Sequence, residues 1–281
     1  MNEIVKKLYH IGIFPIIKPQ NPQEAVSLAG AVNLGGVPCV VIANSNKSEE
    51  SIEQICKTYP NMIVGAGEII DVKQAANAID AGAKFITSYG LCGEVVRYCL
   101  SHGVLIIPCI NNATGVNEAI SLGLDTVGFF PVELSGGLNM IKTLAKAYPD
   151  MNFVPMGGVC NENLYSYLAF CKNLFVGIEV ENNKADVLQK EIRRTVDTML
   201  DFSLRHIGIN CADKEVADDG AKTLADIFSF GIRGCDVSYF VNESFELMKF
   251  IGRGTNGHIA VCTPNVDRAV YHLEKRGVKF D

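Results

Sequence analysis

The chain of 281 residues has no apolar run near the roughly 18 to 20 residues that a membrane-spanning helix needs. It also has no excess of basic residues, because 25 Lys and Arg stand against 31 Asp and Glu, for a formal net charge of −6. A chain of this charge is not expected to bind nucleic acid or an anionic membrane as its main partner. Its first residues carry no small-residue cleavage site of a signal peptide. We therefore expect a cytoplasmic protein that handles small molecules.

Cysteine pairs of the C-x-x-C type are absent as well, although the chain has ten cysteines. The cysteines lie scattered in apolar stretches such as VPCVVIA (residues 37–43) and HIAVCTP (258–264). This pattern is typical of buried, reduced thiols in a reducing compartment. A metal cluster or a nucleophilic thiol is the alternative, and the cysteine spacing does not favour it.

Eight short apolar runs recur along the chain, with helical patterns between them. Their starts lie roughly 20 to 27 residues apart, which is the length of one strand and one helix. The runs are continuously apolar, as in strands that are covered on both faces. They span residues 12–18, 37–43, 61–67, 84–88, 104–110, 125–130, 152–156 and 173–178.

The segments between the runs carry helix signals. Asn21 is a predicted cap, Pro22 stands at the first helical position, and Gly35 ends the helix. Eight strand–helix units in about 200 residues predict an α/β fold, a (β/α)8 TIM barrel over residues 1–205. A doubly wound open sheet is the alternative. The regular units, and the absence of G-x-G-x-x-G after the first run, favour the barrel.

The pattern changes near residue 205. A long helix over residues 184–205 is expected to close the barrel, and residues 206–281 are expected to form a separate small α+β module. The module starts with a strand and a helix, continues with an antiparallel strand pair around residues 242–244, and ends with a second strand–helix unit. The two units echo each other in HIGI and HIAV, which indicates an internal duplication.

The active site of a TIM barrel lies at the carboxyl ends of its strands, where the residues of this chain are polar and mostly acidic. Glu68 follows a GAG turn that brings the backbone close to a ligand, so we expect it to face the mouth together with Lys18. Carboxylates there suit general acid–base catalysis or a hard cation. The alternative is that Glu68 and Glu133 cap the next helices. The expected set is Lys18, Asn44, Glu68, Ser88, Tyr89, Cys109, Phe130, Glu133, Met156, Gly157, Gly158, Glu179 and Glu181.

The pair Gly157-Gly158 follows the seventh run, where barrels often bind phosphate through backbone N–H groups. The loop after the eighth run should complete such a site, and it carries Glu179 and Glu181. Carboxylates repel a phosphate at close range. We therefore do not expect a phosphate there.

Six motifs occur in order along the barrel: GGV, VGAGEI, SYGL, IIPCI, FFPVE and PMGGV. In order and spacing they resemble the 2-keto-3-deoxy-6-phosphogluconate (KDPG) / 4-hydroxy-2-oxoglutarate aldolases. The resemblance implies a class I aldolase, usually trimeric, that needs no cofactor and releases pyruvate through a lysine Schiff base. It implies a small keto acid or sugar acid as the ligand. We expect the ligand site to be lined by Lys18, Ser88, Phe130, Pro131, Gly157, Gly158 and Glu179.

The chain departs from this family at the positions of the chemistry. The resemblance puts the Schiff-base lysine at Gly128 and the general-base glutamate at Val41. The family's carboxylate-binding arginine corresponds to Lys18 in this chain, and two of the family's threonines correspond to Glu68 and Met156. A Schiff base needs a primary amine, so we predict that the standard aldolase activity is absent or very weak. Lys18 as a relocated amine is the alternative.

The C-terminal module resembles the vicinal-oxygen-chelate (glyoxalase-like) family in HIGI, FELMKF and GHIAV. That resemblance implies a metal site in which His206, Glu246 and His258 are three of four ligands. These donors suit Zn²⁺, Ni²⁺, Mn²⁺ or Fe²⁺. We expect an incomplete module, or one that a partner chain completes, because the fourth ligand is not found. Ordinary strand starts are the alternative interpretation of the two histidines.

Three functions stay open from the sequence. The first is an enzyme that acts on a keto acid or sugar acid with Glu68 and a divalent metal. The second is a ligand-binding or scaffold protein without catalysis, and the third is an aldolase that uses Lys18. A metal bound at Glu68 and Glu179 would favour the first function. Binding of a keto acid without turnover would favour the second, and a trapped imine would establish the third.

Overall fold

The computed structural model describes residues 2–181, 184–252 and 254–280. The chain folds into two compact units, Met1–Leu200 with Asn265–Asp281, and Asp201–Pro264. None of the helices in the described ranges has the length and apolar character that crossing a membrane requires.

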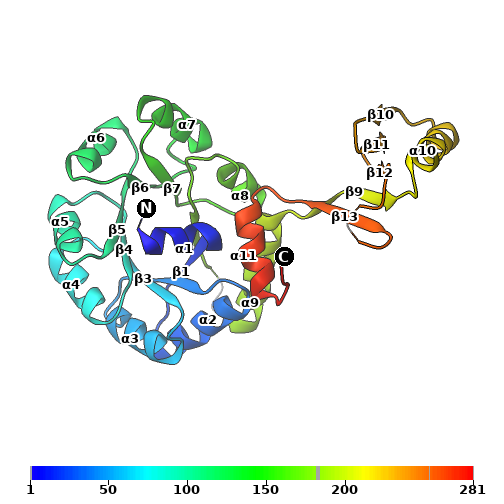
Figure 1. The fold of residues 1–281 in the computed structure, drawn as a ribbon. Helices are drawn as coiled ribbons and strands as arrows, with labels where there is room; N and C mark the ends of the chain where they lie inside the picture. Colours follow the sequence, from blue (N-terminus) through cyan, green and yellow to red (C-terminus); the bar gives the residue numbers. More distant parts are fainter. Residues whose placement is uncertain (1, 182–183, 253, 281) are drawn as a thin grey trace. The chain divides into compact units, whose positions relative to one another are not determined.

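The first unit is a nearly closed barrel of eight parallel strands, with helices between the strands on the outside (Figure 1). The strands follow the order β7-β6-β5-β4-β3-β2-β1-β8. Between β7 and β8 the Phe153 N–H donates to the Lys172 carbonyl at 2.8 Å, which draws the ring together. The predicted TIM barrel is thereby confirmed. The strands span Ile13–Ile17 (β1), Cys39–Ala43 (β2), Ile63–Gly67 (β3), Phe85–Ser88 (β4), Leu105–Ile110 (β5), Thr126–Phe129 (β6), Asn152–Pro155 (β7) and Val176–Glu179 (β8).

The helices of the barrel begin where the sequence signals indicate. Helix α2 spans Pro22–Leu34, and the Asn21 side chain accepts a hydrogen bond from the Glu24 N–H at 2.9 Å. Helix α4, Val72–Asp80, is capped in the same way by Asp71. The others are α1 (Glu3–Ile11), α3 (Ser48–Thr58), α5 (Gly93–Ser101), α6 (Ala113–Ser121), α7 (Gly137–Ala147), α8 (Asn161–Leu168) and α9 (Ala185–Leu200).

Aromatic side chains fill the interior of the barrel. The ring of Phe14 meets Phe85 and Phe175 edge to face, with centroids 5.7 and 5.9 Å apart. Glycines on neighbouring strands give these rings room. A Cβ added to Gly65 would lie 2.5 Å from the Phe85 ring, and one added to Gly177 would lie 2.7 Å from Phe14. The barrel therefore encloses a packed core and not a channel.

The helix that closes the barrel is shorter than predicted. The sequence indicates a helix over residues 184–205, but α9 ends at Leu200 and strand β9 begins at Ser203. The reason is local, because Asp201 adopts a left-handed φ of 38° through which an α-helix does not continue.

The ten cysteines are all free, but only some of them are buried as the sequence suggested. Apolar neighbours along the chain do not guarantee burial at a helix start or on a strand that has one open face. The buried thiols are Cys39, Cys99, Cys109 and Cys211, and the exposed ones are Cys160, Cys171, Cys235 and Cys262.

The second unit is a five-stranded sheet in the order β10-β11-β12-β9-β13. Strand β9 pairs in parallel with β12, and the other neighbours are antiparallel. The predicted strand pair around residues 242–244 is β11 and β12. Helix α10 packs against Val241 and Leu247 on one face of the sheet. The elements span Ser203–Asn210 (β9), Lys214–Phe228 (α10), Ile232–Gly234 (β10), Ser238–Val241 (β11), Phe245–Met248 (β12) and Gly257–Cys262 (β13).

The last helix, α11 (Val266–Lys275), is held to the barrel by buried polar side chains. Arg268 donates from Nε to the Tyr9 carbonyl and from a terminal nitrogen to the Leu174 carbonyl, both at 3.0 Å. Each bond satisfies a backbone carbonyl at the end of the barrel where the strands begin. The helix therefore packs as part of the first unit.

This packing differs from the domain boundaries expected from the sequence, which put residues 206–281 together. Helix α11 groups with the barrel because its buried face carries Arg268 and His272, whose partners are barrel carbonyls. That residues 206–281 form one module by family stays a prediction.

His272 should make the stability of the first unit depend on pH. Its Nε2 donates to the Ile11 carbonyl at 3.0 Å. Burial lowers the pKa of His272 from 6.5 to about 4, and nearby arginine charges act in the same direction. Between these two values the unfolded chain takes up a proton that the folded chain does not. The free energy of unfolding should therefore fall as the pH falls from about 6.5 to about 4.

The variant His272→Gln should flatten this dependence, because glutamine still donates a hydrogen bond and does not titrate. Urea unfolding followed by circular dichroism between pH 4 and pH 8 measures it. The matched control is His102→Gln, an exposed imidazole beside α5, which should keep the slope of the parent. Equal slopes for the parent and His272→Gln would contradict this account.

Candidate functional site

The two candidate catalytic residues meet at the mouth of the barrel. Lys18 follows β1 and Glu68 follows β3, and Lys18 Nζ lies 2.7 Å from Glu68 Oε1. The Tyr89 hydroxyl, after β4, donates to the same oxygen at 2.8 Å. Glu68 adopts a φ of 60°, and it does not cap a helix, because Asp71 fills that role for α4. One carboxylate oxygen thus accepts from two partners.

The electrostatics of this group keep Lys18 charged. The hydrogen bond with Glu68 raises the pKa of Lys18, against a smaller opposing effect of burial. Burial and the hydrogen bond with Glu68 raise the pKa of Tyr89. Both groups therefore stay protonated at neutral pH, and both act here as donors to Glu68.

The space beneath this group is almost filled. The Tyr89 ring stacks on Phe130 with centroids 4.3 Å apart. The enclosed cavity at the mouth has a volume of about 10 Å³, which is room for about one water molecule. The Ser88 hydroxyl donates to the Gly90 carbonyl at 2.7 Å and so is already used within its loop. The cavity is lined by Ile16, Gly67, Glu68, Thr87, Ser88, Tyr89, Phe130, Met156 and Glu179.

Gly128 lies under two side chains that cover it. A Cβ added to Gly128 would lie 2.5 Å from Cys109 Sγ and 2.6 Å from Met156 Cε. Val41, the position that the resemblance gives to the general base, is fully buried and packs over Gly67. Burial raises the pKa of the Cys109 thiol, so this cysteine is not an activated nucleophile.

The glycine pair after β7 is covered by the loop after β6. A Cβ added to Gly157 would lie 2.7 Å from the Phe130 ring and 3.0 Å from Pro131 Cα. One added to Gly158 would lie 2.7 Å from Glu133 Cγ. The structure therefore brings four of the expected ligand residues together, but they pack against one another. These residues are Phe130, Pro131, Gly157 and Gly158.

Glu133 is not a helix cap, contrary to one interpretation of the sequence. The cap position of α7 is Gly136, which makes no side-chain cap bond. Instead the Tyr167 hydroxyl on α8 donates to Glu133 Oε1. Burial, and then this carboxylate, raise the pKa of Tyr167. Sequence reasoning missed Tyr167, because it lies 34 residues from Glu133 and belongs to no motif.

A wider hollow of about 1020 Å³ opens beyond β7 and β8. Its carboxylates outnumber its cations, which supports the expectation that a phosphate is not favoured there. Its charged lining residues are Glu162, Glu179, Glu181, Lys184, Glu191 and Arg194.

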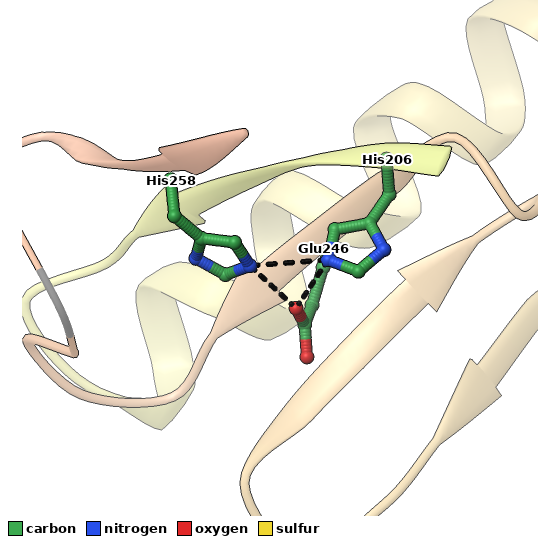
Figure 2. Close-up of side chains that lie close together, drawn as sticks. All are labelled: His206, Glu246 and His258. Atoms are coloured by element: carbon green, nitrogen blue, oxygen red, sulfur yellow. Dashed lines mark hydrogen bonds and ion pairs between the residues drawn. The ribbon is translucent and has the colours of Figure 1, made fainter. Parts of the chain in front are cut away.

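The second unit gathers three side chains that could hold a metal ion on one face of its sheet, and Figure 2 shows them pointing toward a common centre. Glu246 Oε2 lies 3.2 Å from Nε2 of His206 and 3.2 Å from Nε2 of His258. The two Nε2 atoms are 3.0 Å apart. Among the described residues this is the group of three that suits a metal ion. The carboxylates of Glu68 and Glu179, where a bound metal would have favoured the first of the three functions, are not part of such a group.

The spacing of these atoms fits a first-row transition metal. Bonds of about 2.0 to 2.2 Å to nitrogen and oxygen place two ligand atoms about 2.8 to 3.6 Å apart at tetrahedral or right-angled geometry. The three observed separations, 3.0, 3.2 and 3.2 Å, lie within this range. Two histidines and one carboxylate also form the ligand set of open, non-haem metal sites.

The strand register brings the three ligands together. Gly208 on β9 lies opposite both Glu246 on β12 and His258 on β13. A Cβ added to Gly208 would lie 2.1 Å from the His258 ring. Glycine at this position therefore lets the imidazole cross β9 and reach His206.

A buried hydroxyl orients the carboxylate. Ser238 Oγ on β11 donates to Glu246 Oε1 at 2.7 Å, and both residues are buried. This bond leaves Oε2 facing the two histidines. The His206 ring also meets Phe240 edge to face, with centroids 5.5 Å apart. Outer contacts of this kind hold metal ligands in place. Sequence reasoning missed Ser238, because no motif marks it.

The barrel, with its polar mouth at the carboxyl ends of the strands, defines a TIM-barrel protein. The family described as KDPG and KHG aldolase matches residues 4–197, and the chain belongs to that family. The 2-dehydro-3-deoxy-phosphogluconate aldolase of Treponema pallidum is 37% identical over 178 residues, which cover 63% of this chain and 85% of the relative. That of Haemophilus influenzae is 28% identical over 203 residues, 69% and 96% of the two chains.

Solved structures agree on the fold. The 2-keto-3-deoxy-6-phosphogluconate aldolase of Zymomonas mobilis, determined with 3-phosphoglycerate, superposes with a TM-score of 0.64 at 25% identity. It covers 68% of this chain and 94% of its own. The family match ends before Asp201–Pro264, so the second unit lies outside it.

The packing around Gly128 should make even a methyl group costly. We expect Gly128→Ala to lower the free energy of unfolding by about 1 to 3 kcal/mol, the usual effect of overpacking a core. In a Met156→Ala background the cost should be smaller, because one of the two covering groups is gone. Urea denaturation of the four proteins in this double-mutant cycle measures the coupling.

The matched control is Gly90→Ala, at the same mouth, where an added Cβ has no atom within 4 Å. This variant should unfold like the parent. A Gly128→Ala protein as stable as Gly90→Ala would show that the interior has room for a side chain on β6.

Proposed function

We propose that the barrel of this aldolase-family chain is a packed scaffold without the Schiff-base reaction, and that the chemistry of the chain resides at the metal-binding group of the second unit. The observation that carries the first part is the packing of Cys109 and Met156 against Gly128. A lysine amine at that position would have to displace both side chains. The cavity above it, about 10 Å³, is far below the roughly 300 to 1,000 Å³ of typical ligand sites.

Lys18 does not replace the missing amine in this proposal. A Schiff-base lysine must be neutral to attack a carbonyl, and burial usually lowers its pKa for that purpose. Lys18 is in the opposite state: its side chain is 61% exposed and its ammonium pairs with Glu68. The pair supports a structural role, in which Lys18 holds Glu68 and Tyr89 over the filled mouth.

Borohydride trapping tests the proposal for the barrel. The full chain is incubated with pyruvate and borohydride and then examined by intact mass and peptide mapping. We expect no pyruvyl adduct, and no cleavage of 2-keto-3-deoxy-6-phosphogluconate at ordinary enzyme rates of about 1 s⁻¹ or more. The Treponema pallidum aldolase, treated in parallel, serves as the positive control.

An adduct on the peptide that contains Lys18 would overturn this part of the proposal and would make the protein an aldolase with a relocated amine. If the parent gives no adduct, the same assay on Lys18→Met provides the background level of labelling. Binding of pyruvate without an adduct, seen by calorimetry, would instead support a ligand-binding role.

For the second unit, we propose a divalent transition-metal site formed by Nε2 of His206, Nε2 of His258 and Oε2 of Glu246. Support comes from the ligand separations of 3.0 to 3.2 Å and from the hydroxyl that orients Glu246. A metal held by three protein ligands keeps open positions, at which it polarises a bound oxygen and lowers the pKa of a bound water. A small oxygen-rich acid, such as the keto or sugar acid expected from the sequence, is a fitting ligand there.

Metal titration of the full chain tests this site. Co²⁺ binding followed by visible absorption, and Zn²⁺ content after dialysis, should both give one site per chain. We expect Glu246→Gln to abolish it and Ser238→Ala to weaken the affinity by about 10- to 100-fold, the usual effect of losing an orienting contact. The matched control is Glu243→Gln on the same hairpin, whose carboxylate pairs with Arg205 at 2.7 Å.

Equal affinity for the parent and Glu246→Gln would sink the metal proposal. If Glu246→Gln loses metal binding and Ser238→Ala keeps the affinity of the parent, only the orienting role of the Ser238 hydroxyl is rejected. Neither outcome bears on the barrel, so the two parts of the proposal are tested separately.

The trimer implied by the family resemblance, the cytoplasmic location and the glyoxalase-like origin of the second unit remain proposals. Light scattering on the purified protein would test the trimer. The ten free cysteines support a reducing compartment.

A further inference from the structure

A cavity of about 690 Å³ lies at the end of the barrel opposite the mouth, and we call it the basal cavity. Pro38 and Ile63, at the starts of β2 and β3, mark its position. Its walls come from the carboxyl ends of α2 and α3 and from α1, α9 and α11, all within the first unit. Its volume falls within the range of small-molecule sites.

The charges around the basal cavity have one sign. Its described lining contains Lys7, Arg193, Lys275 and Arg276 and no carboxylate. A neighbouring hollow of about 640 Å³ shares Arg193 and adds Lys190, Arg194 and one acid, Asp197. These six cations gather on a chain whose net charge is −6. The concentration of positive charge is therefore local and not a property of the whole protein.

Partners of these cations reduce the charge but do not cancel it. Lys7 pairs with Glu3 at 2.8 Å, and Asp197 is shared by Arg276 at 2.6 Å and Arg193 at 3.6 Å. The carboxyl ends of four helices, α1, α2, α3 and α11, each add about half a negative charge. Together with the two acids these offset about two thirds of the six side-chain charges. Lys275 lies over the Tyr271 ring, 5.8 Å from its centroid, and among the described residues it has no carboxylate partner.

A buried guanidinium lies close to the inner wall of the basal cavity. His272 lines this wall and is neutral at pH 7, because burial, followed by the charges of Arg276, Arg268 and Arg193, lowers its pKa to about 4. The buried Arg268, whose charge acts on His272, bonds to the Tyr9 and Leu174 carbonyls, and among the described residues no acid pairs with it. Burial lowers the pKa of Arg268 to about 10, so it keeps its charge at pH 7.

The rest of the lining is apolar or aromatic. Ile11, Met62 and Val196 face the space, together with the rings of Tyr59 and Tyr271. An inorganic anion would leave this surface uncovered. A molecule with a flat or apolar body and several negative charges would cover it and would pair with the cations at the rim.

We propose that the basal cavity is a binding site for a small organic polyanion with a planar body, the chemical class of a nucleoside phosphate. Lys7 and Lys275 pair with its charges, and Tyr59 and Tyr271 contact its body. The site depends on α11, which lies outside the region that matches the aldolase family, residues 4–197. The site therefore includes a helix outside the matched region, and it is separate from both the mouth and the metal-binding group.

Calorimetric titration of the full chain with ATP, in the presence of EDTA and at physiological ionic strength, is the first test. We expect saturable binding at one site per chain. Pyrophosphate carries the charge without the body, and adenosine carries the body without the charge. Each should bind at least about tenfold more weakly than ATP, because each loses one set of contacts.

The variant Lys7→Gln/Lys275→Gln should weaken ATP binding by about tenfold or more, as expected when hydrogen bonds to charged groups are lost. Both side chains are exposed, and neither holds α11 to the barrel, so we expect the variant to fold. The matched control is Lys6→Gln/Lys279→Gln, which removes two exposed charges from the same ends of the chain but not from the cavity. The control should bind ATP like the parent.

The absence of saturable ATP binding would overturn the proposal, and so would equal losses in the two double variants. If pyrophosphate binds as tightly as ATP, the planar body contributes nothing, and the cavity is a site for an inorganic anion. The Glu246→Gln variant should bind ATP normally, and a loss there would move the site to the second unit. None of these results depends on whether the barrel retains aldolase chemistry.

Discussion

Close packing around Gly128 is the constraint on which the character of the barrel depends. Cys109 Sγ and Met156 Cε close over the one residue of β6 that has no side chain, so no amine projects into the interior. Protein cores are packed too densely to leave a reserve of space for one. The polar groups at the mouth then satisfy one another: Glu68 accepts from Lys18 and Tyr89, and Glu133 accepts from Tyr167. The chain keeps the fold of the family, and the side chains of Cys109 and Met156 pack where the family has its lysine.

The second unit has the opposite arrangement. Three potential ligands from three strands face one point, and the Ser238 hydroxyl bonded to Glu246 leaves the second carboxylate oxygen facing the histidines. The three atoms lie 3.0 to 3.2 Å apart, which allows hydrogen bonds and ion pairs among them and also matches the separations between ligands of one metal ion. At the mouth of the barrel, Lys18 and Glu68 neutralise each other. In the second unit we propose that the three side chains bind a cation, and around the basal cavity we propose that the surplus of positive charge binds an anion.

Much of the fold was predictable because local rules agreed with the packing. Asn21 and Asp71 cap helices as their residue types suggest, and the continuous apolar runs became strands covered on both sides. The mouth was predictable in outline, since strand ends place Lys18 and Glu68 on one rim. Long-range contacts were less predictable: Glu133 binds Tyr167 and caps no helix, and α11 packs on the barrel through Arg268 and His272. The helix predicted over 184–205 ends at Leu200 for a local reason, the left-handed φ of Asp201.

The amino-acid sequence by itself determined the family frame, the order of strands and helices, and the absence of a lysine at position 128, because these are written in periodicity, caps and residue identity. Only the tertiary structure decided what fills the space that the lysine would need, which of the charged residues neutralise one another, and where α11 docks. Those outcomes depend on side chains that are distant in sequence and share one dense interior or one strip of backbone carbonyls. The sequence shows which chemical groups the chain contains, and the packing of the folded chain determines which of these groups contact one another.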